Sequence, residues 1–161
     1  MKDGDAALAP TDRQVLDGID RRILSELSAD GRVSLAELGR RVSLSPPAVA
    51  ERVRRLEETG VITGYHAHVD LAKTGRAVLA LIRMSCYGPA CVLRDDKVPT
   101  WPEVLEISRV TGDTCCVLKV AAASIDAFEE VIDRLGAHGT PSSTMVLSTP
   151  LTWQPITPIG S

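Results

Sequence analysis

The chain has 161 residues, which is enough for one domain of medium size or for two small domains. This length excludes a barrel or a large doubly wound fold. Its 18 Lys and Arg residues and 21 Asp and Glu residues give a net charge of −3, so the whole chain gives no indication of a polyanionic partner. Residues 1–76 carry 12 basic and 12 acidic side chains, whereas residues 77–161 carry 6 and 9. A basic surface is therefore expected only in the first half of the chain.

The composition excludes further classes of protein. Apolar residues make up 44% of the chain and charged residues 24%, which is typical of a folded globular protein and not of a disordered one. No apolar run approaches the ~18 residues that cross a bilayer, and the first residues lack the apolar stretch of a secretory signal. We therefore expect a cytoplasmic protein with no membrane partner. In that compartment the cysteines are expected to be reduced thiols: Cys86, Cys91, Cys115 and Cys116.

Three helices are predicted in the first half, after a polar tail at residues 1–14 that shows no periodicity. The first helix has apolar residues at intervals of three and four, at Leu16, Ile19, Ile23 and Leu27. Asp17 is placed to cap its start, and Asp30-Gly31 ends it. The second helix starts at Ser34, which is expected to form a capping box with Glu37. Its predicted buried stripe is Leu35, Leu38 and Val42.

The third helix follows the second after a short turn. It starts at Ser45-Pro46, because a serine cap and a proline in the first helical position both favour a helix start. Its predicted inner face is Val49, Val53 and Leu56, and Gly60 ends it. Helices at this spacing predict a helix-turn-helix domain over residues 15–62.

The outward face of the third helix is the predicted DNA contact. From Arg40 to Arg55 the chain has five arginines and one acid, a local charge of +4. Guanidinium groups bind phosphates and guanine edges, and the N-terminus of a recognition helix enters the major groove. The predicted contact residues are Ser45, Pro46, Pro47, Ala48, Glu51, Arg52, Arg54 and Arg55. The alternative is a solvated helix face with ordinary pairs, such as Arg54 with Glu58.

All of these residues except Pro46 have an expected role. Ser45 and the helix N-terminus bind phosphate, and Arg54 or Arg55 binds phosphate further along. The side chains expected near base edges are Pro47, Ala48, Glu51 and Arg52.

The second half predicts an α+β domain. Residues 61–69 alternate like a strand, which is either the wing of a winged helix-turn-helix domain or a connector within the hinge at residues 63–75. Strands are then predicted at residues 77–84, 104–110, 116–120 and 144–149, with helices at residues 90–98 and after a Ser124 cap. This βαββαβ order predicts a ferredoxin-like domain over residues 76–150, followed by a Pro-rich tail at residues 151–161.

Finer predictions concern faces and turns of that domain. Leu105 and Ile107 are expected on one strand face, and Thr111-Gly112-Asp113 is expected to form a hairpin turn. The helix after Ser124 ends at Gly136, and its predicted inner residues are Ile125, Phe128, Ile132 and Leu135. A ferredoxin-like fold alone does not name a function. An RNA-recognition module is excluded because its central strands stack bases on aromatic rings, and this chain has only 2 Trp, 2 Tyr and 1 Phe.

Several separated motifs resemble the Lrp/AsnC family of bacterial and archaeal transcriptional regulators. In the first half they are residues 16–24, Asp30-Gly31-Arg32, Leu44-Ser45-Pro46, residues 52–57 and Gly60-Val61-Ile62. In the second half they are Pro102-Glu103-Val104, residues 110–113, Leu118-Lys119-Val120 and residues 146–149. The resemblance covers about residues 15–150 in one register.

The resemblance implies a DNA-binding domain joined to an amino-acid-sensing domain that dimerises through its sheet, with further assembly into rings such as octamers. It also implies an effector cleft between neighbouring domains, lined by Thr111, Gly112, Asp113, Thr114, Cys115, Ser142, Ser143 and Thr144. Asp113 and turn carbonyls suit an ammonium group, and backbone N–H groups and hydroxyls suit a carboxylate. Many relatives read Gly-Asp-Tyr-Asp-Tyr where this chain reads Gly112-Asp113-Thr114-Cys115-Cys116.

Other functions find less support. No nucleophile pairs with a base, so no enzyme is expected. His66 and His68 are expected on one strand face, where they would form half of a metal site completed by Cys86 or Cys91. No metal-ligand spacing in the sequence supports such a site, so no metal or other cofactor is expected. Adjacent Cys115 and Cys116 are expected on opposite strand faces. Redox sensing by Cys115 stays an alternative to simple packing. A ligand-independent architectural DNA-binding protein and a regulatory subunit of a metabolic enzyme remain alternative functions.

Overall fold

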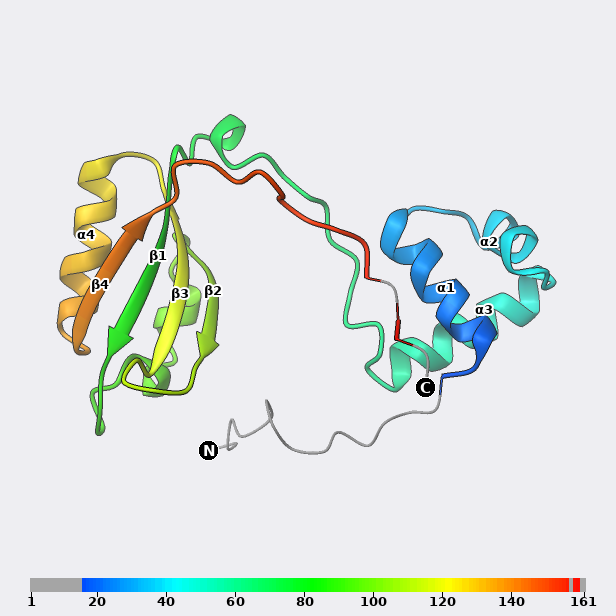
Figure 1. Ribbon diagram of the computed structural model, residues 1–161, viewed down its shortest axis with the longest axis horizontal. Helices are drawn as coiled ribbons and strands as arrows, with labels where there is room; N and C mark the ends of the chain where they lie inside the picture. The colour runs from blue at the N-terminus through cyan, green and yellow to red at the C-terminus, as the bar shows by residue number, and fades with distance from the viewer. Residues whose placement is uncertain (1–15, 157, 160–161) are drawn as a thin grey trace. The chain divides into compact units, whose positions relative to one another are not determined.

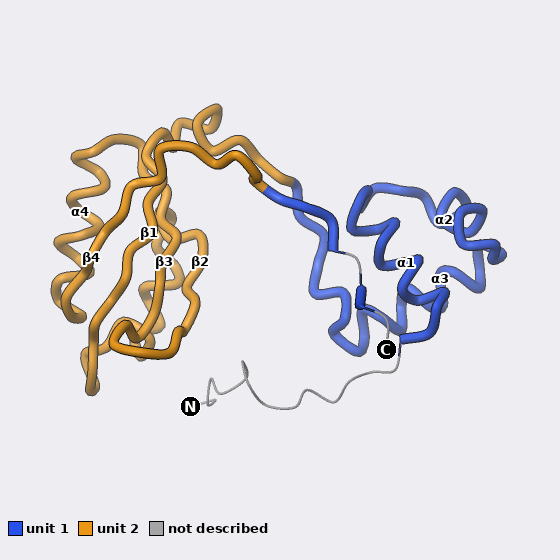
Figure 2. Tube along the Cα trace, in the orientation of Figure 1, with its two compact units in different colours: residues 1–67, 153–161 blue, residues 68–152 orange. Residues whose placement is uncertain are grey.

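The structure is a computed structural model that describes residues 16–156 and 158–159. These residues form two compact units (Figure 2). Unit 1 comprises residues 16–67, 153–156 and 158–159, and unit 2 comprises His68–Thr152. The predicted tail at residues 1–14 lies outside the described residues. Within the described ranges, no helix combines the length and apolar character that would let it cross a membrane.

Unit 1 contains the three predicted helices, α1 (Gly18–Ala29), α2 (Leu35–Val42) and α3 (Pro46–Glu58) (Figure 1). Their buried side chains form one apolar core: Ile23, Leu38, Val42, Val49, Val53 and Leu56. Leu35, predicted in the buried stripe of α2, is instead 43% exposed. It is the first helical residue, so its side chain lies beyond the end of the core.

The caps of α1 and α2 differ in completeness. At α1, the Asp17 carboxylate accepts from the N–H groups of Ile19 and Asp20, and the Asp20 side chain reaches back to the Asp17 N–H, which completes a capping box. At α2, the Ser34 hydroxyl accepts from the Glu37 N–H at 3.2 Å. The return half of the predicted box is missing, because the Glu37 carboxylate binds arginines of its own helix instead.

Residues 61–69 form no strand, so the prediction of a wing or connecting strand is wrong. Their alternating pattern is compatible with a strand, but a strand also needs a neighbouring strand for its backbone N–H and C=O groups. None of the described strands pairs with this segment. After it, a short 3₁₀ helix, η1 (Ala72–Thr74), lies near the start of unit 2.

Unit 2 is an antiparallel sheet with strand order β2-β3-β1-β4 and one long helix, α4 (Ile125–Gly136) (Figure 1). The strands are β1 (Val78–Ser85), β2 (Val104–Arg109), β3 (Cys116–Ala122) and β4 (Thr140–Met145). This is the predicted ferredoxin-like arrangement. Alternate residues of β1, namely Val78, Ala80, Ile82 and Met84, are buried against α4 and the 3₁₀ segments.

The helix predicted at residues 90–98 does not form. Two 3₁₀ helices, η2 (Val92–Arg94) and η3 (Val98–Thr100), occupy this segment and bury Val92 and Val98 in the core. Between them the Asp95 carboxylate accepts from the Lys97 N–H at 2.8 Å, a local turn that competes with a continuous helix.

The last strand, predicted at residues 144–149, runs from Thr140 to Met145. Its position is set by β1, because Ser85 pairs with Thr140 and Ala80 with Met145. β1 offers one further acceptor, the Leu79 carbonyl, to the Val146 N–H, and the pairing then ends.

Two predicted faces of unit 2 also need correction. The pairing of β2 with β3 is irregular between Val104 and Glu106, so Ile107 packs on the core while Leu105 is 43% exposed. In α4, Ile125 is 47% exposed, and Val131 is fully buried in addition to Phe128 and Leu135. Ser124 caps α4 as predicted by accepting from the Ala127 N–H.

Candidate functional site

The turn between α2 and α3 has the tight geometry that a helix-turn-helix requires. Ser43 adopts the left-handed conformation with φ 60° and ψ 44°, and the Leu44 N–H donates to the Gly39 carbonyl at 2.8 Å. A Cβ atom on Gly39 would lie 2.6 Å from the Leu44 carbonyl oxygen. Gly39 is therefore required where the chain folds back on α2. Gly39 was not among the predicted site residues, although a glycine inside a short helix, where it weakens helix formation, is a signal that could have identified it.

The start of α3 is exposed, as a DNA-contacting helix end must be. Ser45 is the N-cap by its backbone, and its hydroxyl makes no capping hydrogen bond. Pro46 and Pro47 occupy the first two helical positions and have no N–H to donate. Ala48 therefore carries the first helical N–H that α3 presents to an anion, so this helix end has fewer backbone donors than a helix start without proline.

A buried carboxylate ties α1 to α3. Asp20 is 1% exposed, and it is the one buried polar residue among those the structure describes. Arg52 Nη1 lies 2.7 Å from Asp20 Oδ1 and 2.6 Å from Asp17 Oδ2, and Arg55 Nη2 lies 2.8 Å from Asp20 Oδ2. Two of the predicted DNA-contacting arginines therefore hold the N-terminal end of α1. Asp20 was not among the predicted site residues, because an acid in the first turn of a helix is ordinarily a solvated residue.

The other arginines of the predicted basic face are paired on the surface. Arg54 Nε lies 3.1 Å from Glu51 Oε2, and Arg54 also bonds Glu58. Arg41 lies 2.9 Å from both Glu37 and Glu26.

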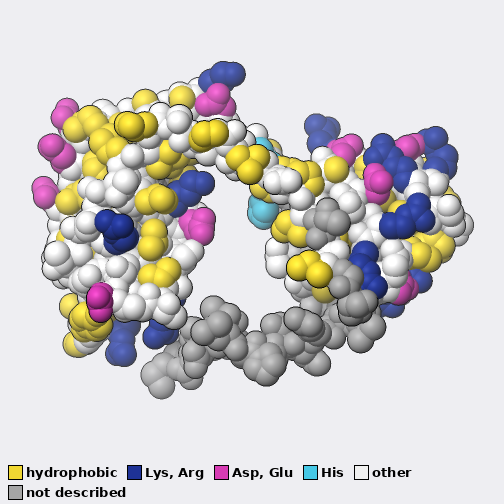
Figure 3. Space-filling view, viewed as in Figure 1, with side chains coloured by type: hydrophobic (Ala, Val, Ile, Leu, Met, Phe, Trp, Pro, Cys, Tyr) yellow, Lys and Arg dark blue, Asp and Glu magenta, His cyan; other side chains and the backbone are white. Residues whose placement is uncertain are grey.

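Arg40 pairs with Glu37 as well. The local charge of +4 is thus offset by acids that mostly lie outside the interval from Arg40 to Arg55. Figure 3 shows the result, with Lys and Arg side chains gathered over the helices of unit 1 and acidic side chains between them.

Three carboxylates of unit 1 have lowered pKa values: Asp17, Glu37 and Glu51. The pKa of Asp17 is lowered first by the hydrogen bond from the Asp20 N–H and then by Arg52. A hydrogen bond from Arg41 lowers the pKa of Glu37, and one from Arg54 lowers that of Glu51. All three acids are therefore ionised at neutral pH.

The turn at residues 111–114 joins β2 to β3 as a hairpin. Gly112 has φ 100°, a conformation that favours glycine. The Asp113 carbonyl accepts from the Ser85 hydroxyl at 3.3 Å and from the Tyr87 hydroxyl at 3.2 Å, so its orientation is fixed. The Asp113 carboxylate is exposed, and no described residue forms an ion pair or hydrogen bond with it. The turn thus presents an anionic acceptor to solvent.

The predicted hydroxyl residues of β4 do not share one face. Ser142 pairs with Arg83 and Thr144 pairs with Leu81, on the face of β1 that is exposed. Ser143 pairs with buried Ile82 and so lies on the opposite face. β1 separates β4 from β3, and two strand spacings are about 10 Å. Within one chain, the turn and the hydroxyls of β4 do not line one small pocket.

The four cysteines lie together at the end of the sheet where the turn at residues 111–114 joins β2 to β3. Cys115 precedes β3, and its Sγ lies 3.6 Å from Cys116 Sγ, so the prediction that these two side chains lie on opposite faces is wrong. Cys115 Sγ lies 2.7 Å from Cys86 Sγ and 3.8 Å from Cys91 Sγ. Burial raises the pKa of the Cys86 thiol to about 12 and also raises that of Cys116.

Comparison with known proteins links both units to one family. Residues 16–57 match the AsnC-type helix-turn-helix domain, and residues 94–153 match the Lrp/AsnC ligand binding domain. The HTH-type transcriptional regulator YezC of Bacillus subtilis, described as uncharacterized, is 41% identical over 133 residues, which cover 83% of this chain and 94% of YezC. LrpA of Mycobacterium tuberculosis is 37% identical over 142 residues, covering 84% and 93%.

Comparison with solved structures links the chain to the same family. The structure of LrpC from Bacillus subtilis has a TM-score of 0.80 at 34% identity, covering 87% of this chain and 100% of that one. The feast or famine regulatory protein of M. tuberculosis complexed with L-methionine has a TM-score of 0.79 at 35% identity, covering 89% and 100%. The family comprises transcriptional regulators and not enzymes. This chain, with its helix-turn-helix unit and its ferredoxin-like unit, belongs to the Lrp/AsnC family of transcriptional regulators.

Proposed function

We propose that this protein is a sequence-specific DNA-binding regulator of transcription whose DNA affinity or assembly responds to an amino acid. The observation that carries the proposal is the turn at Ser43, closed against Gly39, which leaves the start of α3 exposed in a chain of this family. Such a regulator works in the cytoplasm, where bacterial and archaeal DNA lies.

The contacts within unit 1 divide the predicted DNA-binding residues into two groups. Ser45, Pro46, Pro47, Ala48, Glu51 and Arg54 form the DNA-contacting group, since they line the outward face of α3 without holding another helix. Arg52 and Arg55 form the orienting group, because Asp20 holds both. Arg54 then binds phosphate by exchanging its exposed carboxylate partners, a pair worth about 0–1 kcal/mol.

The effector binds at residues 111–115, with the Asp113 carboxylate taking its ammonium group. Backbone N–H groups and the hydroxyls of β4 suit its carboxylate. Because β1 separates these two halves in one chain, a neighbouring copy supplies the second half of the cleft. Assembly into a dimer, or a larger ring such as an octamer, follows from this arrangement. Leu81, 42% exposed on the open face of the sheet beside Lys119 and Thr144, supports a second copy covering that face.

The relatives favour an amino acid of moderate size. One solved relative, from M. tuberculosis, is complexed with L-methionine, and another, from Neisseria meningitidis, is an L-Met complex. Several curated relatives are leucine-responsive regulatory proteins. L-methionine and L-leucine are therefore the first candidates for this chain.

A thermal-unfolding screen against the amino acids tests the sensing half of the proposal. A ligand at ~100 times its dissociation constant adds about 2.7 kcal/mol of stability, which raises the melting temperature by several degrees. Asp113→Asn should remove the shift and leave melting without ligand unchanged, because this exposed carboxylate holds no described residue. If no amino acid shifts melting or DNA binding, the protein is an architectural DNA-binding protein instead. If it binds no operator fragment at low salt, a regulatory subunit of an enzyme becomes the better account.

A further inference from the structure

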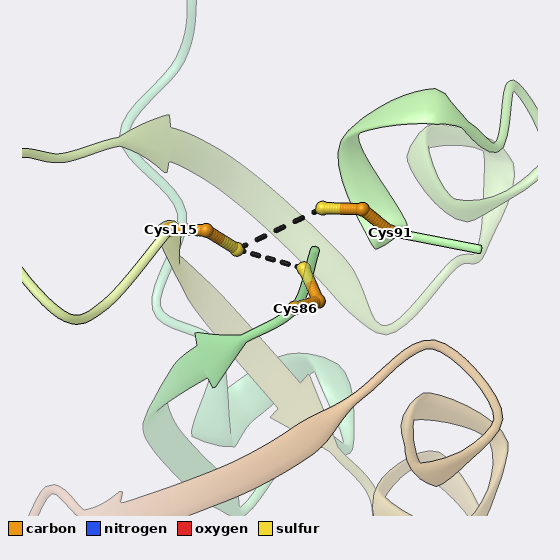
Figure 4. A group of neighbouring side chains, drawn as sticks. All are labelled: Cys86, Cys91 and Cys115. Atoms are coloured by element: carbon orange, nitrogen blue, oxygen red, sulfur yellow. Dashed lines mark hydrogen bonds between the residues drawn. The ribbon is translucent and has the colours of Figure 1, made fainter. Parts of the chain in front are cut away.

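Three thiols from separate segments converge at one end of the sheet (Figure 4). Cys86 directly follows β1, Cys91 is the N-cap residue before η2, and Cys115 precedes β3. Their Sγ atoms all lie within 4.8 Å of one another. Cys86 and Cys91 are 4% and 7% exposed, while Cys115 is half-buried. The cluster is therefore shielded on two sides and open to small ions at Cys115.

The backbone holds each of these thiols in place. The Cys115 N–H donates to the Met84 carbonyl at 2.8 Å, and the Cys91 N–H donates to the Gly88 carbonyl at 3.3 Å. At Cys86 the chain is packed so closely that a Cβ atom on Gly139 would lie 2.6 Å from Cys86 Cβ. Convergence is thus a property of the fold, because the segments that carry the sulfurs are fixed before any ligand binds.

The distances suit thiolate coordination. A zinc–sulfur bond of about 2.3 Å in a tetrahedral site separates two ligand sulfurs by about 3.8 Å. The sulfurs of Cys91 and Cys115 lie 3.8 Å apart, and the 2.7 Å between Cys86 and Cys115 widens to this value with a small side-chain rotation. A disulfide would join two of the sulfurs at about 2.05 Å and give the third no role.

We propose that Cys86, Cys91 and Cys115 form a binding site for a thiophilic metal ion of the zinc and cadmium type, held by three thiolates. On binding, each thiol releases its proton to solvent and donates a sulfur lone pair to the metal; no electron is transferred. The cluster contains no described carboxylate or imidazole, so hard ions such as Mg²⁺ and Ca²⁺ do not suit it. Cys116, although 3.6 Å from Cys115, is outside the group of three.

Titration of the full-length, reduced protein with Cd²⁺ tests this site, since cadmium thiolates absorb in the ultraviolet. The expected result is a charge-transfer band that saturates at one ion per protomer, proton release in weak buffer, and displacement of the band by Zn²⁺. Cys86→Ala and Cys91→Ala should each lose the band at stoichiometric Cd²⁺. Cys116→Ala should keep it, which makes it the matched control; circular dichroism verifies that every variant is folded.

Three results would overturn the proposal. One is the absence of a band in the reduced wild-type protein, and another is an unchanged band in Cys91→Ala. The third is a Cys86–Cys115 disulfide with free Cys91 in protein isolated under thiol-blocking conditions, found by mass spectrometry. That last result would assign the cluster to thiol oxidation instead.

Discussion

The two candidate binding sites differ in whether their charged side chains already have partners. In unit 1, every arginine from Arg40 to Arg55 is already paired with a carboxylate of the same unit. In unit 2, the turn at residues 111–114 presents the Asp113 carboxylate with no partner among the described residues. Unit 1 must exchange ion pairs to bind a phosphate, whereas the turn offers its charge directly. A local count of charges therefore overstates the charge that is available for binding.

The pairs of unit 1 also differ among themselves. The side chains of Arg40 and Arg54 are 76% and 55% exposed, so water screens their pairs and exchange with phosphate costs little. The pairs with Asp20 are different, because this carboxylate is 1% exposed and its loss of a cation is not compensated by water. Arg52 thus holds a buried carboxylate of another helix, whereas Arg54, for which we propose a DNA contact, makes only exposed pairs within its own helix.

The largest expected effect comes from removing both arginines that hold Asp20. In the double variant Arg52→Ala, Arg55→Ala, the carboxylate stays buried without a cation, which costs about 3–5 kcal/mol. Urea unfolding followed by helical circular dichroism measures the unfolding free energy of unit 1. Adding Asp20→Asn should restore most of the loss, because no buried charge remains. A loss below about 1 kcal/mol in the double variant would show that Asp20 gains water or another donor.

The next effect concerns the helix-turn-helix turn. Gly39→Ala places a Cβ atom 2.6 Å from the Leu44 carbonyl oxygen, so the turn must shift at a cost of about 1–3 kcal/mol, and α3 is misplaced for operator binding. Gly18→Ala is the matched control, because nothing lies within 4 Å of its new Cβ atom. Gel-shift titration and thermal unfolding compare the two variants. Equal operator affinity in both would refute the role of Gly39.

A smaller effect separates Arg54 from the orienting arginines. Arg54→Ala removes a phosphate ligand but no buried contact, so unit 1 keeps its unfolding free energy within about 1 kcal/mol. DNA affinity falls by a similar factor for operator and random DNA, and the slope of log K against log salt decreases by about 1. Fluorescence anisotropy at several salt concentrations gives this slope. An unchanged slope would show that Arg54 does not contact the phosphate backbone.

Local signals in the sequence predicted three helix starts and the hairpin turn. Asp17 and Ser124 mark helix starts because their side chains accept from backbone N–H groups two or three residues later. Pro46 marks a helix start because its fixed φ suits the first helical position. Gly112 marks a turn for the same kind of local reason. These features depend on nearby atoms alone, so a single sequence contains the information needed to predict them.

Features that depend on distant pairing were not predictable in this way. The position of β4 depends on its register with β1. Residues 61–69 form no strand because no described strand pairs with them, and the segment's own sequence does not reveal whether a partner strand exists. The site residues show the same limit. Asp20 is buried because Arg52 and Arg55, which follow it by 32 and 35 residues in the chain, reach it. Cys86 meets Cys115 only through the fold.

The smallest expected effect is a difference in acid unfolding between the two units. In unit 1, Asp17, Glu37 and Glu51 have lowered pKa values. Among the carboxylates in the described part of unit 2, only Glu103 has a lowered pKa; burial opposes the shift, and its own backbone N–H and then Arg134 produce it. A lowered pKa in the folded state gives stability that is complete above the unfolded-state values, about 3.9 for Asp and 4.3 for Glu, and that is lost as the pH falls through the folded-state pKa.

Unit 1 should therefore lose stability below about pH 4 before unit 2 does, and neither should change between about pH 5 and 8 on account of these acids. Helical circular dichroism is the readout for unit 1, which contains most of the described helix. Fluorescence of Trp101 in a Trp153→Phe variant is the readout for unit 2, where Arg134 lies 4.2 Å from the centre of the Trp101 ring. Replacing Glu37 with Gln should move the acid midpoint of unit 1 toward that of unit 2, because one of the lowered pKa values is removed. Coincident midpoints in the wild-type protein would mean that the ion pairs of unit 1 do not set its acid stability.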